Sequence, residues 1–290
     1  MKKNILIAGT SSYIGDSFYQ YMALHAPEAV CTCLDMTDSA WREHDFSEDH
    51  VVYMVAGIAH VKETASNREL FYRVNRDLAV ELAKRAKAAG VGQFIYLSSM
   101  NVYGKDTGVI TDCTELKPGS SYACSKAQAE ELLSRLRCDT FRVAILRPPM
   151  VYGRGCKGNY RSLEKLALRL PFFPKIRNQR SMIYIDNLSA CVLVIIEQEV
   201  DGCCCPQNDE YVCTYDLVRR IAHAHGRQIV PGIVSGFLLS VFGRFFTVTR
   251  KAFGSLIYQR TVGTPVSYHA ISLEESLQAM YACERAEQVP

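Results

Sequence analysis

The sequence lacks several features that mark particular classes of protein. Its 290 residues include a single tryptophan and contain no internal repeat, no low-complexity tract and no block of like charges. The net charge of +3 gives no reason to expect a nucleic-acid partner. No apolar run approaches the ~20 residues of a membrane-spanning helix. With 48% hydrophobic and 22% charged residues, the chain has the composition of a soluble globular protein with a large core.

The chain contains twelve cysteines, but their spacing does not match a zinc site, and we do not expect them to form disulfides. The N-terminus leads directly into a strand-like segment without a cleavable signal, so we expect a cytoplasmic protein with reduced thiols. The spacings Cys31-x-Cys33 and Cys203-Cys204-Cys205 do not give the paired C-x2-C of a structural zinc site. We therefore expect no metal and no disulfide, with Cys203–Cys205 as a place liable to oxidation.

Strand-like and helix-like segments alternate through the first half of the chain. The expected strands are Asn4–Ala8, Val30–Leu34, Val51–Val55, Gln93–Ser98 and Thr140–Leu146. The expected helices are Gly15–His25, Arg68–Ala89, which Gly90 would close, and Ser121–Leu136. This alternation predicts an α/β fold with a doubly wound parallel sheet (Rossmann type), in which ligands bind at the carboxyl ends of the strands.

Beyond Gly153 the pattern changes to loops, prolines and short helices. We expect one domain over residues 1–153 and a smaller lobe over 154–290. Residues 180–200, with a strand Met182–Ile185 and a helix Asn187–Glu197, would return to the main sheet. The absence of a linker indicates that the two parts interleave along the chain.

The segment Ile229–Leu256 is apolar but interrupted by glycines and basic residues. Two interpretations remain open. It forms a helix of the core or of the smaller lobe, or it forms an amphipathic helix that lies on a membrane surface.

The first expected strand ends in a turn that suits a dinucleotide. Gly9 would allow the tight turn and Gly15 the close packing of helix on strand, while backbone N–H groups receive a pyrophosphate. Asp35 ends the second strand, where an acidic residue reads a ribose 2′-hydroxyl. An ordinary strand–helix turn is the alternative.

Tyr122 and Lys126 lie four residues apart and share one face of an expected helix. An ammonium beside a phenol favours the phenolate, so we expect the Tyr122 pKa to lie below its ordinary value. Such a phenol exchanges a proton with a carbinol oxygen, and Ser99, at the end of the preceding strand, would hydrogen-bond the same oxygen.

These features together resemble the extended short-chain dehydrogenases/reductases, in the group of NAD-dependent nucleotide-sugar epimerases and dehydratases. The resemblance is clear from about residue 4 to 190. It rests on motifs that occur in the family's order: Gly9-x5-Gly15, Val55–Ala59, Val74-Asn75, Leu97–Gly104, Tyr122-x3-Lys126, Leu146–Gly153 and Arg180–Leu188.

The resemblance implies NAD as cofactor and assigns residues to it. Asp35 would hold the adenine ribose and disfavour a 2′-phosphate, and Ser12 stands where the family usually has glycine. Asn75 would brace the neighbouring strand. The implied cofactor-binding residues are Gly9, Ser12, Tyr13, Ile14, Gly15, Asp35, Asp45, Phe46, Ala56, Gly57, Tyr122 and Lys126.

The resemblance also implies a catalytic set. Tyr122 would be the acid or base, Ser99 would polarise the sugar oxygen, and Lys126 would hydrogen-bond the nicotinamide ribose. Met100 and Asn101 replace the Asp-Glu pair that the family's 4,6-dehydratases use, so neither can supply the proton for loss of water. Epimerisation at C4 and net reduction of a keto sugar remain, with a non-catalytic dinucleotide-binding protein as a third alternative.

The smaller lobe would bind the nucleotide sugar. Asn159, in the segment Lys157–Tyr160, and Arg180 resemble the family's diphosphate-binding residues, and the segment resembles that of enzymes acting on UDP-N-acetylhexosamines or their 4-keto-6-deoxy derivatives. Family members commonly dimerise, so we expect a homodimer through helices 68–89 and 121–136.

Overall fold

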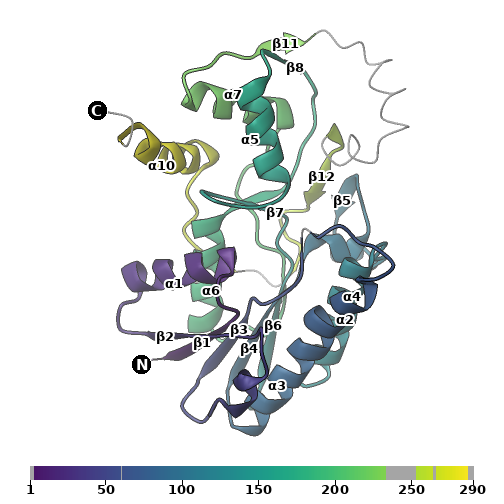
Figure 1. Ribbon diagram of the computed structural model, residues 1–290, viewed down its shortest axis with the longest axis vertical. Coiled ribbons are helices and arrows are strands. Elements are labelled where there is room, and N and C mark those ends of the chain that lie inside the picture. Colours follow the sequence, from purple (N-terminus) through teal and green to yellow (C-terminus); the bar gives the residue numbers. More distant parts are fainter. Residues whose placement is uncertain (1–2, 60, 233–252, 264–265, 287–290) are drawn as a thin grey trace.

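A computed structural model describes residues 3–59, 61–232, 253–263 and 266–286. Its centre is a six-stranded sheet in the order β10-β6-β4-β3-β1-β2, with all neighbouring strands parallel (Figure 1). The strands are β1 (Asn4–Ala8), β2 (Val30–Leu34), β3 (Val51–Met54), β4 (Gln93–Leu97), β6 (Arg142–Leu146) and β10 (Gly202–Cys204).

Helices cover both faces of this sheet (Figure 1). One face carries α1 (Tyr13–His25) and α6 (Ile185–Glu197), and the other carries α2 (Arg68–Tyr72), α3 (Leu78–Ala88) and α4 (Ser121–Ser134). Alternation along β1 sends Ile5 and Ile7 to the first face and Leu6 and Ala8 to the second. The predicted doubly wound parallel sheet is therefore confirmed.

The return of residues 180–200 to the main sheet is only partly as expected. Helix α6 packs against the sheet, but β9 (Met182–Tyr184) pairs with β7 (Met150–Tyr152) in a separate two-stranded sheet. The expected strand is therefore present, but its expected place in the main sheet was wrong, because β10, which the sequence pattern did not reveal, lies beside β6.

The expected helix 68–89 is helical throughout but not uniform. A π-helical segment, Arg73–Asp77, separates α2 from α3 and places Asn75 in the interior with no exposed surface. Gly90 follows the helix with a φ of +90°, and this left-handed conformation explains why glycine ends the helix there.

The upper part of the molecule is built from helices around a tyrosine-rich core (Figure 1). Its elements are α5 (Asn159–Arg169), α7 (Thr214–Ala224), α10 (Leu273–Ala286), β8 (Phe172–Pro174) and β11 (Val230–Gly232). Strand β5 (Gly108–Ile110) pairs with β12 (Leu256–Tyr258), so segments from distant parts of the chain meet here. The domain boundary at Gly153 stays a prediction.

Short 3-10 turns occur at Ala40–Glu43 and Met100–Tyr103. None of the helices in the described ranges is long and apolar enough to cross a membrane. Most of Ile229–Leu256, residues 233–252, lies outside the described residues, so both interpretations of that segment stay open.

Candidate active site

The turn after β1 requires glycine at both expected positions. Gly9 has a φ of +131°, and a Cβ there would lie 2.7 Å from the backbone nitrogen of Ala56. A Cβ on Gly15 would lie 2.9 Å from the Val55 side chain. The Ser12 hydroxyl accepts a hydrogen bond from the Gly15 N–H at 3.4 Å and so caps α1. Tyr13 and Ile14 begin the helix, whose N-terminus faces the strand ends.

Two acidic residues lie in the connection between β2 and β3. The Asp35 carboxylate accepts a hydrogen bond from the Thr37 N–H at 2.9 Å, and this bond lowers the Asp35 pKa. Asp45 accepts from the Ser47 N–H at 3.0 Å, which lowers its pKa in the same way. The side chain of Phe46 is buried in the core, so only its backbone is placed to meet a cofactor.

Gly57 lies against Asn75 and Lys126, which leave little room for a side chain at this position. A Cβ on Gly57 would lie 3.0 Å from Asn75 Oδ1 and 3.2 Å from Lys126 Nζ. Asn75 Oδ1 accepts from the Ile58 N–H at 2.8 Å, and Nδ2 donates to the Ile58 carbonyl and to the Ser125 hydroxyl, both at 3.1 Å. The expected brace by Asn75 is confirmed, and it also reaches α4.

Ser99 and Tyr122 meet at the carboxyl end of β4. The Ser99 side chain interacts with the Tyr122 phenol and lowers its pKa, and the Ser99 hydroxyl accepts a hydrogen bond from the Asn101 N–H at 3.2 Å. Glu63 holds the start of α4 by accepting from the Ser121 N–H at 3.0 Å and from the Ser121 hydroxyl at 2.8 Å. No pattern in the sequence indicated that Glu63 would bind the start of α4.

Lys126 lies 4% exposed beneath the same site. Its ammonium donates to the Leu97 carbonyl at 2.7 Å and lies 4.6 Å from the centre of the Tyr96 ring. Burial lowers the pKa of Lys126 to about 7, and the negative charge of Glu130 opposes this shift.

The expected low pKa of Tyr122 is not found. Burial raises the Tyr122 pKa, and the hydrogen bond from Ser99 opposes that rise only in part. The reason is that the Lys126 ammonium is directed to the Leu97 carbonyl and the Tyr96 ring. In this state Tyr122 holds its proton at neutral pH.

A buried ion pair supports the site from the far side of α4. Arg147 binds the Glu130 carboxylate through Nη2 at 2.6 Å and Nε at 3.1 Å, and Ser98 also hydrogen-bonds this carboxylate. Arg147 Nη1 donates to the Tyr103 hydroxyl at 2.8 Å. The spacing of Glu130 four residues beyond Lys126 was the available signal for this group in the sequence.

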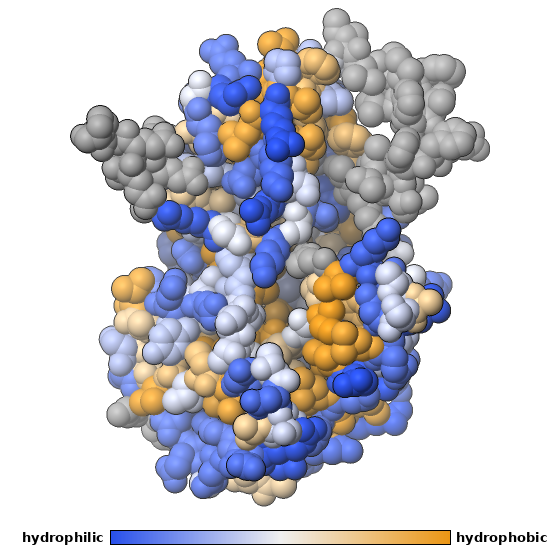
Figure 2. Space-filling view, viewed as in Figure 1, coloured by the Kyte–Doolittle hydropathy of each residue, from blue (hydrophilic) through white to orange (hydrophobic). Residues whose placement is uncertain are grey.

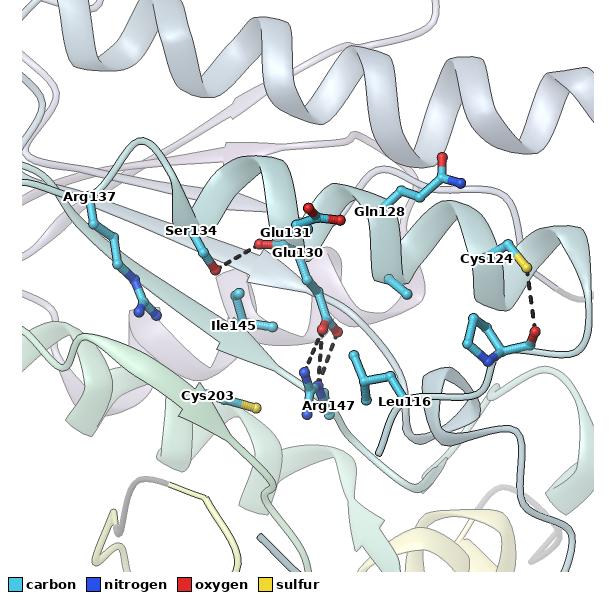
Figure 3. Close-up of a pocket in the computed structure, with 12 residues that line it drawn as sticks. Leu116, Cys124, Gln128, Glu130, Glu131, Ser134, Arg137, Ile145, Arg147 and Cys203 are labelled. Atoms are coloured by element: carbon cyan, nitrogen blue, oxygen red, sulfur yellow. Dashed lines mark hydrogen bonds and ion pairs between the residues drawn. The ribbon is translucent and has the colours of Figure 1, made fainter. Parts of the chain in front are cut away.

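A cavity of about 540 Å³ opens beside this ion pair, between α4 and the ends of β6 and β10 (Figure 3). Its walls include Glu130, Arg147 and Cys203 but none of Ser99, Tyr122 and Lys126. It is therefore separate from the predicted cofactor site. Figure 2 shows a hollow between the sheet part and the upper part of the molecule, on the face seen there.

The two expected sugar-binding residues lie on different elements of the upper part. Asn159 is exposed at the first position of α5. Arg180 is half-buried, its Nη1 donates to the Gly254 carbonyl at 2.9 Å, and its backbone bridges Val212 and Leu256. Their role in binding a diphosphate stays a prediction.

Comparison with known proteins identifies the family. A model of the NAD dependent epimerase/dehydratase family matches residues 5–203. The UDP-glucose 4-epimerase of Vibrio cholerae is 29% identical over 274 residues, which cover 85% of this chain and 83% of that protein.

Solved structures share the fold. The UDP-glucuronic acid 4-epimerase from Bacillus cereus in complex with NAD has a TM-score of 0.73 at 17% identity and covers 96% of this chain and 95% of its own. The dTDP-4-dehydrorhamnose reductase from Bacillus anthracis in complex with NADP has a TM-score of 0.69 at 16% identity, covering 97% and 99%.

The turn geometry fits the cofactor of this family. The glycines that a Cβ would block, the helix N-terminus and the charged Asp35 suit a dinucleotide with a free ribose 2′-hydroxyl. The family model matches more than half of the length of the chain. The chain belongs to the NAD-dependent epimerase/dehydratase family, among the extended short-chain dehydrogenases/reductases.

Proposed function

We propose that this protein is a nucleotide-sugar 4-epimerase that acts on a UDP-hexose or a UDP-N-acetylhexosamine through a 4-keto intermediate. The observation that carries the proposal is the convergence of Ser99, Tyr122 and Lys126 at the carboxyl edge of the sheet, beside Gly57. The similarity to the UDP-glucose 4-epimerase of Vibrio cholerae supports the choice of reaction.

The protein's own residues would handle the proton. Tyr122 removes the proton of the sugar 4-hydroxyl as the sugar is oxidised and returns it when the keto group is reduced on its other face. Ser99, whose side chain lowers the pKa of Tyr122, would hydrogen-bond the same oxygen. Bound NAD would supply a hydride acceptor and donor at C4, with Lys126 and Asp35 among the residues that hold it.

Lys126 would set how readily Tyr122 gives up its proton. With a pKa of about 7, Lys126 changes charge near neutral pH, and its charged form favours the Tyr122 phenolate. Oxidation of the sugar therefore needs Lys126 protonated and turned towards Tyr122. Asn159 and Arg180 would bind the diphosphate of the substrate.

A second candidate is a 4-ketoreductase that acts on a UDP-4-keto-6-deoxy sugar. The similarity in fold to the dTDP-4-dehydrorhamnose reductase supports it. Met100 and Asn101 are compatible with both candidate reactions, since neither epimerisation nor reduction requires the loss of water. The two candidates use the cofactor differently. An epimerase regenerates its bound cofactor in each cycle, whereas a net reductase must exchange the oxidised cofactor for a reduced one.

The first experiment is mass spectrometry of the small molecules released from the denatured protein, followed by incubation with UDP-glucose and UDP-N-acetylglucosamine. Retained NAD and formation of the galacto epimers would establish the 4-epimerase. A protein that is empty and inert on both sugars without added cofactor would favour the reductase, to be tested with 4-keto-6-deoxy sugars and NADH.

The variant Tyr122→Phe separates an enzyme from a non-catalytic dinucleotide-binding protein. It removes the transferable proton but keeps the ring, which packs 6.5 Å from the Phe71 ring, so the fold should be retained. We expect turnover to fall by at least about a hundredfold. Unchanged turnover would refute the role of Tyr122. The matched control is Tyr72→Phe in α2.

A further inference from the structure

Residues 157–177 carry the excess positive charge of this protein. They include six basic residues and only one acidic residue, Glu164. Since the net charge of the whole chain is +3, the remaining residues together are net negative. Glu164 is half-buried, and its carboxylate accepts a hydrogen bond from the Tyr281 hydroxyl of α10 at 2.7 Å. The positive charge is therefore concentrated on one short segment of the upper part.

These basic side chains are not used to hold the protein together. In the part of the chain that the structure describes, none of the six forms an ion pair or a side-chain hydrogen bond. Exposed arginines elsewhere are paired, as Arg42 is with Glu81 and Arg135 with Glu131. The unpaired charges of residues 157–177 are thus available to an anionic partner.

Three of the basic residues form a stripe along α5. Arg161, Lys165 and Arg169 are four residues apart, so they lie on one side of the helix, and all three are exposed. The opposite side of α5 buries Leu163 and Ala167 in the tyrosine-rich core. The packing of α5 therefore fixes which way the stripe faces.

Two large apolar side chains are exposed next to this stripe. Phe173 of β8 is buried in the core, so alternation along the strand directs Phe172 outwards, where it is 54% exposed. Phe172 is paired in register with Val230 of β11, which is 62% exposed, and paired residues of neighbouring strands share one face. Figure 1 shows β8 and β11 at the end of the upper part that is farthest from the main sheet.

The stripe and the apolar pair form one continuous surface. Only two residues separate Arg169 from Phe172, and Lys175 is exposed directly after β8. Figure 2 shows hydrophobic and hydrophilic residues side by side over this end of the molecule. We call this surface the tip face; it consists of Lys165, Arg169, Phe172, Lys175 and Val230.

We propose that the tip face binds the surface of a membrane that contains anionic phospholipids. Phe172 and Val230 enter the boundary between headgroups and acyl chains, and the basic side chains contact the lipid phosphates. A soluble polyanion such as a nucleic acid would use the charges but would leave the two apolar side chains in water, so the combination favours a lipid. Residues 233–252 follow β11 outside the described residues, and the tip face does not include them.

Binding in this way leaves the proposed substrate site accessible. Asn159 begins α5, whereas the tip face lies around the other end of this helix. The 11 residues of α5 separate the two ends by about 16 Å. The protein would therefore rest on the membrane by its tip, with Asn159 held away from the lipid.

The test is flotation of the native full-length protein with lipid vesicles. We expect at least about tenfold more binding to phosphatidylcholine vesicles with about one third phosphatidylglycerol than to phosphatidylcholine alone. Salt at about 0.5 M should release most of the bound protein, because it screens the charges. No binding to the anionic vesicles, or equal binding to both kinds, would overturn the proposal. The measurement needs no turnover, so its result is independent of the proposed function.

Variants then locate the binding on the tip face. The double variant Lys165→Gln/Arg169→Gln should weaken binding by at least about tenfold, since each basic residue near an anionic surface contributes about fivefold. Phe172→Ser should weaken binding by about fivefold, because the ring no longer enters the lipid boundary. All three side chains are exposed, so the fold should be retained. Variants that bind as tightly as the wild type would refute the proposal.

Matched controls change exposed residues outside the upper part. Lys117→Gln/Arg142→Gln removes two charges, and Leu24→Ser removes an apolar side chain. Both should bind the vesicles like the wild type. Heparin is the competing ligand: weak vesicle binding, together with heparin binding that Phe172→Ser leaves unchanged, would assign the face to a soluble polyanion and overturn the membrane proposal.

Discussion

The carboxylate of Glu130 lies one helical turn beyond Lys126 on α4, and its charge keeps the Lys126 pKa from falling further in this buried position. Arg147 neutralises Glu130 in turn through a two-pronged ion pair. The protonation of Lys126 thus depends on the buried charges of Glu130 and Arg147.

The variant Glu130→Gln should be strongly destabilised. It leaves the Arg147 guanidinium, 15% exposed in its side chain, without its charge partner, at a cost of about 3 to 5 kcal/mol in the free energy of unfolding. Urea denaturation measures this. The adjacent control Glu131→Gln removes only an exposed pair with Arg135 and should change stability by less than about 1 kcal/mol. Equal effects of the two variants would contradict the importance of the buried pair.

Stability relative to the variant Lys126→Met should rise with pH. The folded-state pKa of Lys126 is about 7 against an ordinary 10.5, so above about pH 7 the unfolded chain binds a proton that the folded chain has lost. The penalty for burying the charge is complete below pH 7 and is relieved as pH rises towards 10.5. The unfolding free energy of the wild type minus that of Lys126→Met should increase by up to about 1.4 kcal/mol per pH unit.

Denaturation curves of both proteins at pH 7, 8 and 9 measure this difference. Lys84→Met, on the exposed side of α3, is the control and should follow the pH dependence of the wild type. A difference that stays flat or falls over this range would show that Lys126 is charged in the folded protein at all three pH values.

The variant Ser12→Gly should bind NADH more tightly. It removes a side chain from the predicted path of the pyrophosphate and frees the Gly15 N–H, which Ser12 now occupies at 3.4 Å, to donate to a phosphate. The loss of the cap on α1 should cost only a few tenths of a kcal/mol, as for other replacements of serine by glycine. NADH fluorescence titration measures the affinity. Weaker binding would indicate instead that the serine hydroxyl itself donates to the cofactor.

The predicted homodimer should have twice the mass of the chain by light scattering. Leu70 is 40% exposed on α2, which belongs to the predicted interface helix 68–89, so Leu70→Lys should shift the mass towards the monomer. Leu24 of α1 is 79% exposed on the opposite face of the sheet, and Leu24→Lys should leave the mass unchanged. A wild-type protein of monomer mass would contradict the prediction.

Local pattern was sufficient to predict most of the central sheet. β1 and β2 have the predicted bounds, because their apolar runs end at a glycine and an acidic residue. β10 was not predicted because Gly-Cys-Cys is short and has no strand pattern of its own. These residues form a strand because they pair with the free edge of β6. The π-helical segment was missed for a related reason, since the contacts of Asn75 that accompany it are distant in sequence.

The motifs were sufficient to predict which residues form the candidate site, but they did not predict the pKa of Tyr122. Spacing alone indicated that Tyr122 and Lys126 share a helical face, but the Tyr122 pKa depends on how deeply the phenol is buried and on where the Lys126 ammonium is directed. Glu63 reaches Ser121 from a distant loop, and no local pattern relates the two residues. Such properties depend on the packing of segments far apart in the chain.

The pairing of β5 with β12 has a consequence for how the protein is made. Residues 108–110 must wait for residues 256–258 to emerge from the ribosome before their strand partner exists. The main sheet likewise gains its last strand only after residue 204. Since such long-range contacts form late, the nascent chain exposes the edge of β6 until residue 204 has been made and the surface around Arg180 until residue 256 has been made. A protein interrupted before residue 256 would therefore be a substrate for chaperones rather than a smaller working enzyme.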